Sequence, residues 1–264
     1  MSKLLDMFAQ ARRAQSGSGM GFLGKNRAEA KPRVAALVVE LTSTDAADAA
    51  NAEAAIKAGA DGLLFTWNGK DTSWLESLKS AVEAAQASNE KAVCGLHITG
   101  GWHTIDRENL EHLKDQGIAF IVLPLEAPAS LLALRVKDLD LVVTVPMREG
   151  DFYPLLIRNL TAFNNITAVQ LDFDLSKDAG KLTIEDVLQY RAVREAARYP
   201  ALLNVPTGMS ETGAYTLTTL GVQSVVLAVS EIDTKTKQHI KNLHELLEKV
   251  HQEDTDSKQT TIKQ

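Results

Sequence analysis

Three residues with acid–base capacity follow apolar runs of the sequence and could do chemistry together: Glu40, His97 and Asp172. Histidine exchanges protons near neutral pH, and a neighbouring carboxylate can orient its ring. We therefore predict these residues as the catalytic group. His97 and Asp172 form the expected acid–base pair, and Glu40 is expected to orient a substrate or a metal.

Further polar residues stand at the ends of other apolar runs and are expected to bind the substrate. Arg148 is expected to bind an anionic group, and Glu126 shares the orienting role with Glu40. The whole expected binding set is Asn68, Thr99, Glu126, Arg148, Asp174 and Asn204. Carboxylates on several strands would also suit Mg²⁺ or Mn²⁺, which prefer oxygen ligands, but no diagnostic spacing names a metal.

A repeated local pattern indicates the elements that must position these side chains. Gly59, Gly117 and Gly221 each end a helix-like segment, and an apolar run begins a few residues later. Glycine can adopt the left-handed conformation that closes a helix. The apolar run suits a strand buried on both faces, as in parallel sheets. Helix, glycine and buried strand in repetition are typical of βα units.

The pattern extends over the chain and predicts eight strand–helix pairs. The expected strands are 34–41, 62–67, 92–99, 120–125, 141–146, 167–173, 201–205 and 224–229. Eight such pairs in 264 residues predict an α/β fold of the (β/α)8 TIM-barrel type, which typically takes about 250 residues. An open, doubly wound sheet is the alternative, although no Gly-x-Gly-x-x-Gly follows the first strand.

The predicted organisation is a single domain with two terminal additions. Residues 1–31 form an N-terminal extension, residues 32–251 the barrel, and residues 252–264 a polar tail that we expect to be disordered. In the extension, Leu4, Leu5, Phe8 and Ala11 share one face of a short helix. This helix either plugs the bottom of the barrel, contacts a partner or frays.

Side-chain alternation predicts which residues face the barrel mouth. In the sixth strand, Gln170, Asp172 and Asp174 share a face opposite Val169, Leu171 and Phe173. The third strand repeats this, with Gly95, His97 and Thr99 opposite Cys94, Leu96 and Ile98. Since barrels carry reactive groups at the carboxyl ends of their strands, the polar faces are expected to form a pocket there. The other interpretation is a structural network in which the polar groups satisfy one another.

Composition narrows the classes of partner. The formal net charge is −6 without a basic cluster, which disfavours nucleic acids and anionic membranes. Cys94 is the only cysteine, which precludes an intrachain disulfide and favours a reducing compartment. No apolar stretch reaches about 18 residues, so no spanning helix is expected. We expect a cytoplasmic protein with a small-molecule ligand, and a homo-oligomer remains open.

One stretch carries a family resemblance. The segment 204–210, Asn-Val-Pro-Thr-Gly-Met-Ser, followed by 220–227, resembles the seventh and eighth units of the phosphate-binding TIM barrels. That superfamily includes indole-glycerol-phosphate synthase, phosphoribosylanthranilate isomerase and flavin-binding barrels such as nitronate monooxygenase. The resemblance implies a phosphate site at Thr207, Gly208 and Ser210. The chain departs from the family after the eighth strand, where Glu231 would repel a phosphate; FMN is accordingly the less favoured cofactor.

These observations favour a small-molecule enzyme whose active site lies at the carboxyl end of the barrel. The expected reaction is lyase or isomerase chemistry by acid–base catalysis on a polar metabolite, phosphorylated or not. An FMN-dependent oxidoreductase and a non-catalytic binding or assembly barrel remain the two alternatives.

Overall fold

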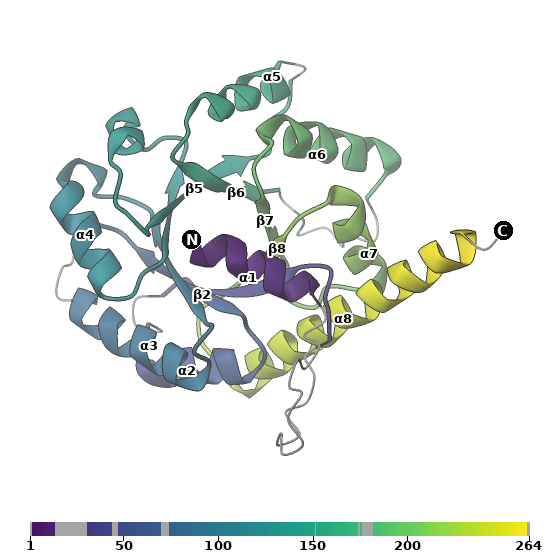
Figure 1. Cartoon of the computed structure of the whole chain (residues 1–264), viewed down its shortest axis with the longest axis horizontal. Coiled ribbons are helices and arrows are strands. Elements are labelled where there is room, and N and C mark those ends of the chain that lie inside the picture. Colours follow the sequence, from purple (N-terminus) through teal and green to yellow (C-terminus); the bar gives the residue numbers. More distant parts are fainter. Residues whose placement is uncertain are drawn as a thin grey trace.

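Eight parallel strands close into a barrel in the computed structural model of the chain (Figure 1). The structure describes residues 2–13, 31–43, 47–69, 74–150, 152–173, 175 and 182–262. The strands pair in sequence order, and β8 closes the ring on β1. Their bounds are β1 Ala36–Leu41, β2 Gly62–Trp67, β3 Val93–Ile98, β4 Phe120–Pro124, β5 Asp140–Pro146, β6 Ile166–Asp172, β7 Ala201–Val205 and β8 Ser224–Val229. The predicted (β/α)8 barrel is confirmed.

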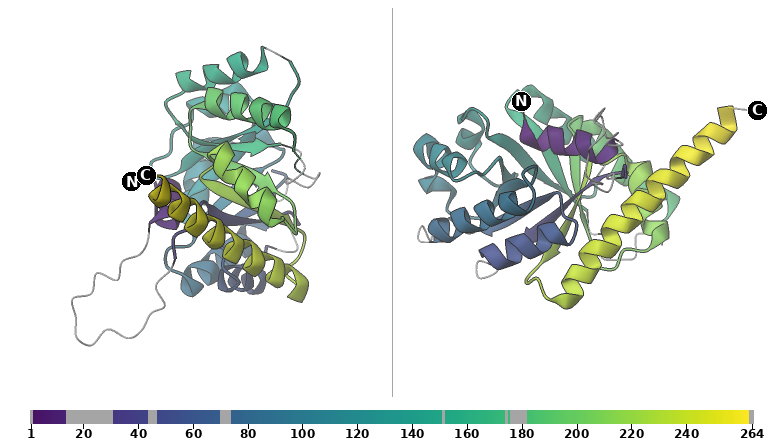
Figure 2. Two further views of the ribbon diagram at one scale, coloured as in Figure 1. Left: turned by 90° about the vertical axis from the view of Figure 1, so that its right-hand side faces the viewer. Right: turned by 60° about the horizontal axis from the view of Figure 1, so that its bottom comes forward.

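Helices surround the barrel on its outer side (Figures 1 and 2). They are α2 Ala49–Lys57, α3 Trp74–Ser88, η2 Trp102–Thr104, α4 Arg107–Asp115, η3 Ala129–Ala133, α5 Tyr153–Arg158, η4 Asn159–Ala162, α6 Ile184–Ala197, α7 Glu211–Leu220 and α8 Thr234–Ile262. The sequence predicts that the last helix ends at Val250. Instead, α8 continues through most of the polar segment 252–264 and extends beyond the barrel (Figure 2). Within the described residues, no helix has both the length and the apolar character needed to cross a membrane.

Local sequence signals set the ends of several helices. Asp106, Thr183 and Ser210 precede α4, α6 and α7, and each side chain accepts a hydrogen bond from a backbone N–H of the first turn. The three glycines of the repeated pattern follow the predicted geometry, with φ of 116° at Gly59, 95° at Gly117 and 66° at Gly221. The basis of the βα assignment is therefore confirmed.

The base of the barrel is closed by α1, Lys3–Arg12, which lies across the centre of the ring in Figure 1. Its buried face consists of Leu4, Met7, Phe8 and Ala11, and it packs against inward-facing side chains such as Val38, Leu64 and Val226. Two polar contacts hold its ends: Ser2 Oγ donates to Asp140 Oδ2 at 2.5 Å, and Arg12 Nη2 donates to the Val222 carbonyl at 2.8 Å. The predicted N-terminal helix is thus a plug.

The alternation predicted for the strands is also confirmed. Val169, Leu171 and Phe173 join the large core between strands and helices, whereas Ala168 belongs to the core inside the barrel. The same division separates Cys94, Leu96 and Ile98 from Val93 on β3. Side chains two or four residues further along the inward faces therefore lie above this inner core, at the mouth.

Candidate active site at the barrel mouth

The inward-facing layer at the mouth consists of polar residues in two groups. The first group is Glu40 on β1, Thr66 on β2 and His97 on β3; the second is Thr144 on β5, Gln170 and Asp172 on β6, and Asn204 on β7. The strands between the groups contribute apolar side chains at the same level, Pro124 on β4 and Ala228 on β8. The mouth therefore has two polar sides separated by apolar positions.

The first group is centred on a carboxylate–imidazole contact. Glu40 Oε1 lies 2.7 Å from His97 Nδ1, and the side chains are 8% and 19% exposed respectively. Thr66 Oγ1 donates to the same carboxylate oxygen at 3.2 Å. Because a carboxylate can only accept, the contact requires the proton to be on Nδ1. In the neutral ring, the lone pair then belongs to Nε2, which is the arrangement that a general base requires.

Backbone contacts between neighbouring loops hold this group in place. Thr66 and His97 are register partners on β2 and β3, and the loops after these strands meet at Gly69 and Gly101. A Cβ on Gly69 would lie 2.7 Å from the Cα of Gly101, so a side chain would separate the two loops. Both glycines also have positive φ, 74° and 65°. Glycine at both positions thus permits the close approach.

The second group is a chain of amide hydrogen bonds whose direction is fixed by its carboxylate end. Asn204 Nδ2 donates to Asp172 Oδ1 at 3.0 Å, and Gln170 Nε2 donates to Asn204 Oδ1 at 2.8 Å. Since Asp172 only accepts, Asn204 must present its amino group to it and its oxygen to Gln170. Gln170 therefore keeps its own carbonyl oxygen at the far end of the chain.

That oxygen is an unused acceptor inside the barrel wall. Gln170 is 1% exposed, and its Oε1 has no hydrogen-bond partner among the described residues. The hydroxyl of Thr144, the register partner of Gln170 on β5, is buried and without a partner within the same part of the chain. Leaving such groups unmet costs about 1–3 kcal/mol each. The arrangement suits a donor supplied by water or by a ligand.

The predicted acid–base pair is divided between the two groups. His97 contacts Glu40, and Asp172 contacts Asn204. Strands β3 and β6 are separated by β4 and β5 in one direction round the barrel and by four strands in the other. Asp172 is exposed at the rim, whereas Glu40 is buried. The partner that the structure gives to His97 is therefore Glu40.

Two other predicted residues, Glu126 and Arg148, contact each other. Arg148 Nη2 lies 2.9 Å from Glu126 Oε1, and both side chains are more than half exposed. They belong to the segments that follow β4 and β5, so the ion pair lies at the mouth end of the barrel wall. Their opposite charges offset each other there, and an exposed ion pair of this kind contributes little to stability.

The remaining predicted binding residues lie at the rim. Asn68 and Thr99 directly follow β2 and β3 and are exposed, with Thr99 Oγ1 donating to the Trp67 carbonyl at 3.2 Å. Asp174 lies outside the described residues. No three His, Cys, Asp or Glu side chains within the described ranges gather closely enough to hold a metal ion.

The segment that resembles a phosphate loop has the expected glycine but carboxylate neighbours. Gly208 has φ of 81°, and Thr207 and Ser210 are exposed. Ser210 Oγ already accepts from the Gly213 N–H, at 3.1 Å, in the first turn of α7. On the β8 side, Glu231 is exposed and Asp233 caps α8 by accepting from the Thr236 N–H at 2.6 Å. This hydrogen bond holds the pKa of Asp233 below its usual value.

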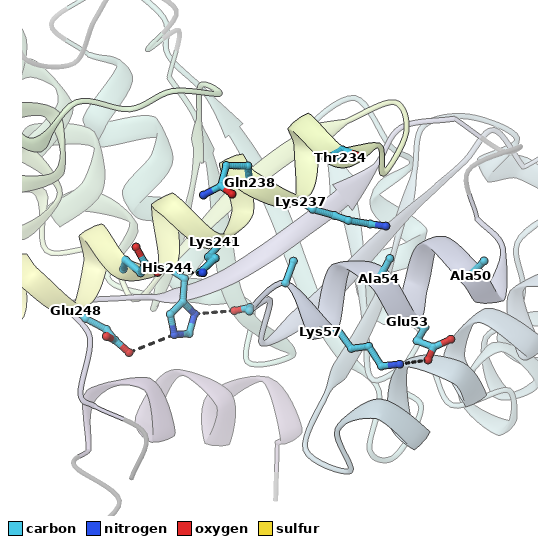
Figure 3. A pocket seen from close by; sticks show the side chains of 13 residues that line it. Ala50, Glu53, Ala54, Lys57, Thr234, Lys237, Gln238, Lys241, His244 and Glu248 are labelled. Carbon is cyan, nitrogen blue, oxygen red and sulfur yellow. Dashed lines mark hydrogen bonds and ion pairs between the residues drawn. The ribbon is translucent and has the colours of Figure 1, made fainter. Parts of the chain in front are cut away.

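Two surface hollows elsewhere do not include the predicted catalytic residues. A groove of about 950 Å³ between α2 and α8 has an alanine-lined floor and polar walls (Figure 3). Its walls carry three lysines and three glutamates, namely Lys57, Lys237, Lys241, Glu53, Glu245 and Glu248, so its formal charge is zero. A second hollow, of about 530 Å³, lies at the base beside α1. Neither contains Glu40, His97 or Asp172.

Comparison with known proteins identifies the fold. No family model matches the chain, and no curated protein matches it in sequence. Among solved structures, the chain is similar to tryptophan synthase from M. tuberculosis, with a TM-score of 0.59 and 14% identity over 94% of this chain and 100% of that chain. It is also similar to thiamine phosphate pyrophosphorylase from Pyrococcus furiosus, with a TM-score of 0.58 and 11% identity over 83% of this chain and 98% of that chain. The chain has the TIM-barrel fold. Identities this low show the fold alone.

The predicted catalytic and binding residues omit three polar residues of the mouth layer, Thr66, Thr144 and Gln170, although alternation along the sixth strand already directs Gln170 toward the mouth. Alternation along the strands is the signal that identifies them, because Thr66 lies two residues after the inward-facing Leu64, and Thr144 two after Val142. Their neutral side chains suggest no chemistry in a sequence. The structure identifies them through hydrogen bonding: Thr66 donates to Glu40 and Gln170 to Asn204. The Thr144 hydroxyl and Gln170 Oε1 have no partner among the described residues.

Proposed function

We propose that this protein is an enzyme that transfers protons on a small polar substrate at the barrel mouth, in a lyase or isomerase reaction. The observation that carries the proposal is the 2.7 Å contact between Glu40 Oε1 and His97 Nδ1. It provides an oriented imidazole at the end of the barrel where such folds carry their active sites. Proton transfer by a positioned histidine contributes about 10²- to 10⁴-fold to a reaction rate.

Each residue of the site has a distinct role in this proposal. His97 exchanges a proton with the substrate through Nε2. Glu40 holds the ring in the tautomer with the proton on Nδ1 and stabilises the imidazolium that forms when Nε2 takes up a proton. Asp172 and Asn204 hold the substrate from the other polar side of the mouth, while Pro124 and Ala228 lie between the two sides.

The charges of the mouth favour a neutral or cationic, unphosphorylated substrate. Asp172 and Glu231 are exposed carboxylates, and Arg148, the cation predicted to bind an anionic group, already faces Glu126. The unused Gln170 Oε1 is an acceptor, so the group that completes it must be an N–H or O–H donor. A hydroxyl- or amine-bearing metabolite meets these conditions, and a phosphate monoester meets fewer of them.

Phosphate binding at Thr207, Gly208 and Ser210 is the competing proposal, and with it FMN. Its support is the resemblance of the loop after β7 and the positive φ of Gly208. The carboxylates of Glu231 and Asp233 count against it because they would repel a phosphate. Calorimetric titration with inorganic phosphate and with FMN separates the two proposals. Binding that Gly208→Val abolishes would favour the phosphate site over the unphosphorylated substrate.

The test of proton transfer is solvent exchange. The protein is incubated in D₂O with a panel of polyols, hydroxy acids and amino alcohols, and deuterium entering carbon-bound positions is followed by mass spectrometry. We expect incorporation into at least one compound and a loss of about 100-fold or more in His97→Asn. His103→Asn is the matched control, because His103 lies in the loop after the same strand and is exposed. Incorporation that persists in His97→Asn would contradict the proposal.

A further inference from the structure

Five large apolar side chains are exposed together on two neighbouring helices, and we call this surface the α5/α6 patch. It consists of Phe152, Leu155 and Leu156 at α5 and Ile184 and Leu188 on α6. Their exposed fractions range from 57% at Leu155 to 82% at Ile184. The two helices pack against each other and lie side by side in Figures 1 and 2.

Helical spacing aligns the exposed side chains on each of the two helices. Leu155 and Leu156 follow Phe152 by three and four residues, and Leu188 follows Ile184 by four, so each set lies on one face of its helix. The opposite faces are already committed to the core, through Tyr153 and Ile157 on α5 and Val193 and Ala197 on α6. The patch is therefore additional to the apolar surface that the fold requires.

The area of the patch matches an interface. A fully exposed side chain of this size presents roughly 150–200 Å², so the patch leaves roughly 600 Å² of apolar surface in water. The largest patch on an ordinary monomer is about 300–600 Å². A standard interface covers about 800 Å² per partner, of which rather more than half is apolar. One face of this size supplies the apolar part of a stable dimer.

The charges around the patch permit a second copy of the chain to occupy it. The exposed charged residues of α5 and α6 are Arg158, Glu185, Arg191 and Glu195, whose formal charges cancel. A two-fold interface brings a surface against itself, so a rim of one sign would repel its own copy. An anionic membrane or a nucleic acid would require a basic rim instead.

We propose that the α5/α6 patch is the two-fold interface of a homodimer. Phe152 directly precedes α5 and Ile184 begins α6, and these helices follow β5 and β6. The patch therefore lies at the mouth end of the barrel wall. The second copy lies beside the segments that carry Arg148 and Asp172. The inference is independent of the chemistry proposed at the mouth.

The test is the oligomeric state of the full chain in solution, measured by sedimentation velocity over a concentration series. We expect a dimer that dissociates on dilution. In the Ile184→Glu/Leu188→Glu variant the dissociation constant should rise at least about 100-fold, because two charges per copy would enter the interface. Leu5→Glu is the matched control, since Leu5 is an exposed leucine on α1, outside the patch, and its dimer should be unchanged.

Hydrogen exchange locates the interface without a substitution. Amides of residues 152–158 and 184–191 should exchange more slowly above the dissociation constant than below it, while those of α2 should not change. A chain that stays monomeric at about 100 μM would overturn the proposal, because a standard interface binds more tightly than that. A dimer that the double variant leaves intact, or protection that appears elsewhere, would overturn it as well.

Discussion

The phenyl ring of Phe120 fills the space in which a side chain of Gly95 would begin. The two residues are register partners on β4 and β3, and the three atoms nearest to a Cβ built on Gly95 are all carbons of that ring. Gly95 lies two residues before His97 on the same inward face. The absence of a side chain at Gly95 therefore lets a large ring fill the barrel directly below His97.

Gly95→Ala should lower the free energy of unfolding by about 1–3 kcal/mol, because the added methyl group overpacks a filled interior. Combining it with Phe120→Leu should recover part of this loss, since the two positions share one volume. Urea unfolding of the two single variants and the double variant gives the coupling energy. Strictly additive effects would show that the ring and the glycine do not compete for space.

The Cys94 thiol should be inert in the folded protein. Burial raises its pKa from 9.0 to about 12. Well below pH 9 the thiol is protonated in both states and contributes no pH dependence. Between pH 9 and 12 it ionises only in the unfolded chain, so the unfolding free energy should fall by up to ~1.4 kcal/mol per pH unit from this group.

Two measurements check this expectation. A thiol reagent should label the native protein only as fast as it unfolds. In Cys94→Ala, the unfolding free energy should fall less steeply between pH 8 and 10, because the contribution from thiol ionisation in the unfolded chain is gone. Rapid native labelling would contradict the buried position of the thiol.

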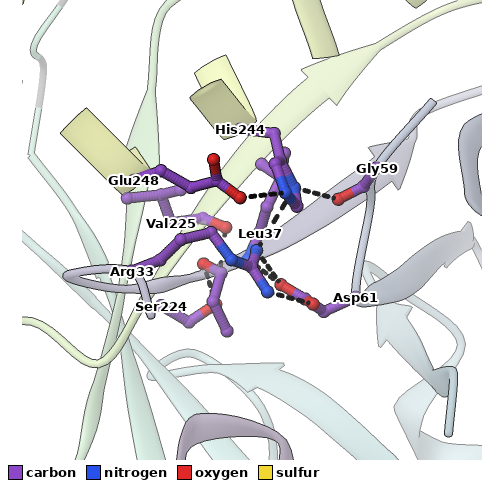
Figure 4. Close-up of polar contacts among 9 residues, drawn as sticks. Arg33, Leu37, Gly59, Asp61, Ser224, Val225, His244 and Glu248 are labelled. Carbon is purple, nitrogen blue, oxygen red and sulfur yellow. Dashed lines mark hydrogen bonds and ion pairs between the residues drawn. The ribbon is translucent and has the colours of Figure 1, made fainter. Parts of the chain in front are cut away.

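Asp61→Asn should destabilise the protein by about 3–5 kcal/mol by leaving Arg33 without its counter-charge. The carboxylate accepts two 2.7 Å hydrogen bonds from the Arg33 guanidinium and a third from the Leu37 N–H (Figure 4). His244 adjoins this pair, with Nδ1 3.4 Å from Arg33 Nη1. The same Nδ1 lies 2.7 Å from the Gly59 carbonyl, and Nε2 lies 3.3 Å from Glu248 (Figure 4).

The exposed ion pair of Arg107 and Glu111 provides the control for that substitution. Glu111→Gln should cost under about 1 kcal/mol in the same denaturation assay. The double variant Arg33→Met/Asp61→Asn should be more stable than Asp61→Asn alone, because no unpaired charge remains. Equal stability of these two variants would show that the cost does not come from the charge of Arg33.

The tautomer of His97 can be read directly by long-range ¹H–¹⁵N correlation at a pH where histidine rings are neutral. The Nδ1–H form should predominate, because Glu40 can only accept. In Glu40→Leu this preference should be lost, while exposed His103 should be unaffected. A dominant Nε2–H form in the unaltered protein would contradict the arrangement on which the proposed proton transfer depends.

The strands could be predicted well because burial on both faces leaves a strong local signal. For β7 and β8 the predicted and observed bounds agree, since Ala201–Val205 and Ser224–Val229 are apolar runs between polar or helix-ending residues. Short helices were less predictable. The sequence predicts a helix from residue 151 toward Phe163, but α5 ends at Arg158. There Thr161 Oγ1 donates to the Arg158 carbonyl and a 3₁₀ turn, η4, follows.

The candidate site was predictable in its membership and less so in its contacts. Alternation places His97 and Asp172 on inward faces because the side-chain period of a strand is two. Which inward residues meet depends on the stagger of the strands around the barrel, which no local pattern records. The α5/α6 patch escapes prediction for a related reason: Leu155 and Ile184 have the composition of core residues, and only the packed structure shows that they face outward.

The plug at the base of the barrel has a consequence for the order of folding. The helix α1 is synthesised before every strand, yet Arg12 bonds the Val222 carbonyl, 210 residues further along the chain. At about 5–20 residues per second, roughly 10 to 40 s pass between the synthesis of the two groups. During that time Phe8 and its neighbours have no complete barrel to enter. The apolar face of residues 3–12 therefore lacks its full set of packing partners until the last strand appears, so complete docking of α1 is a late step in folding.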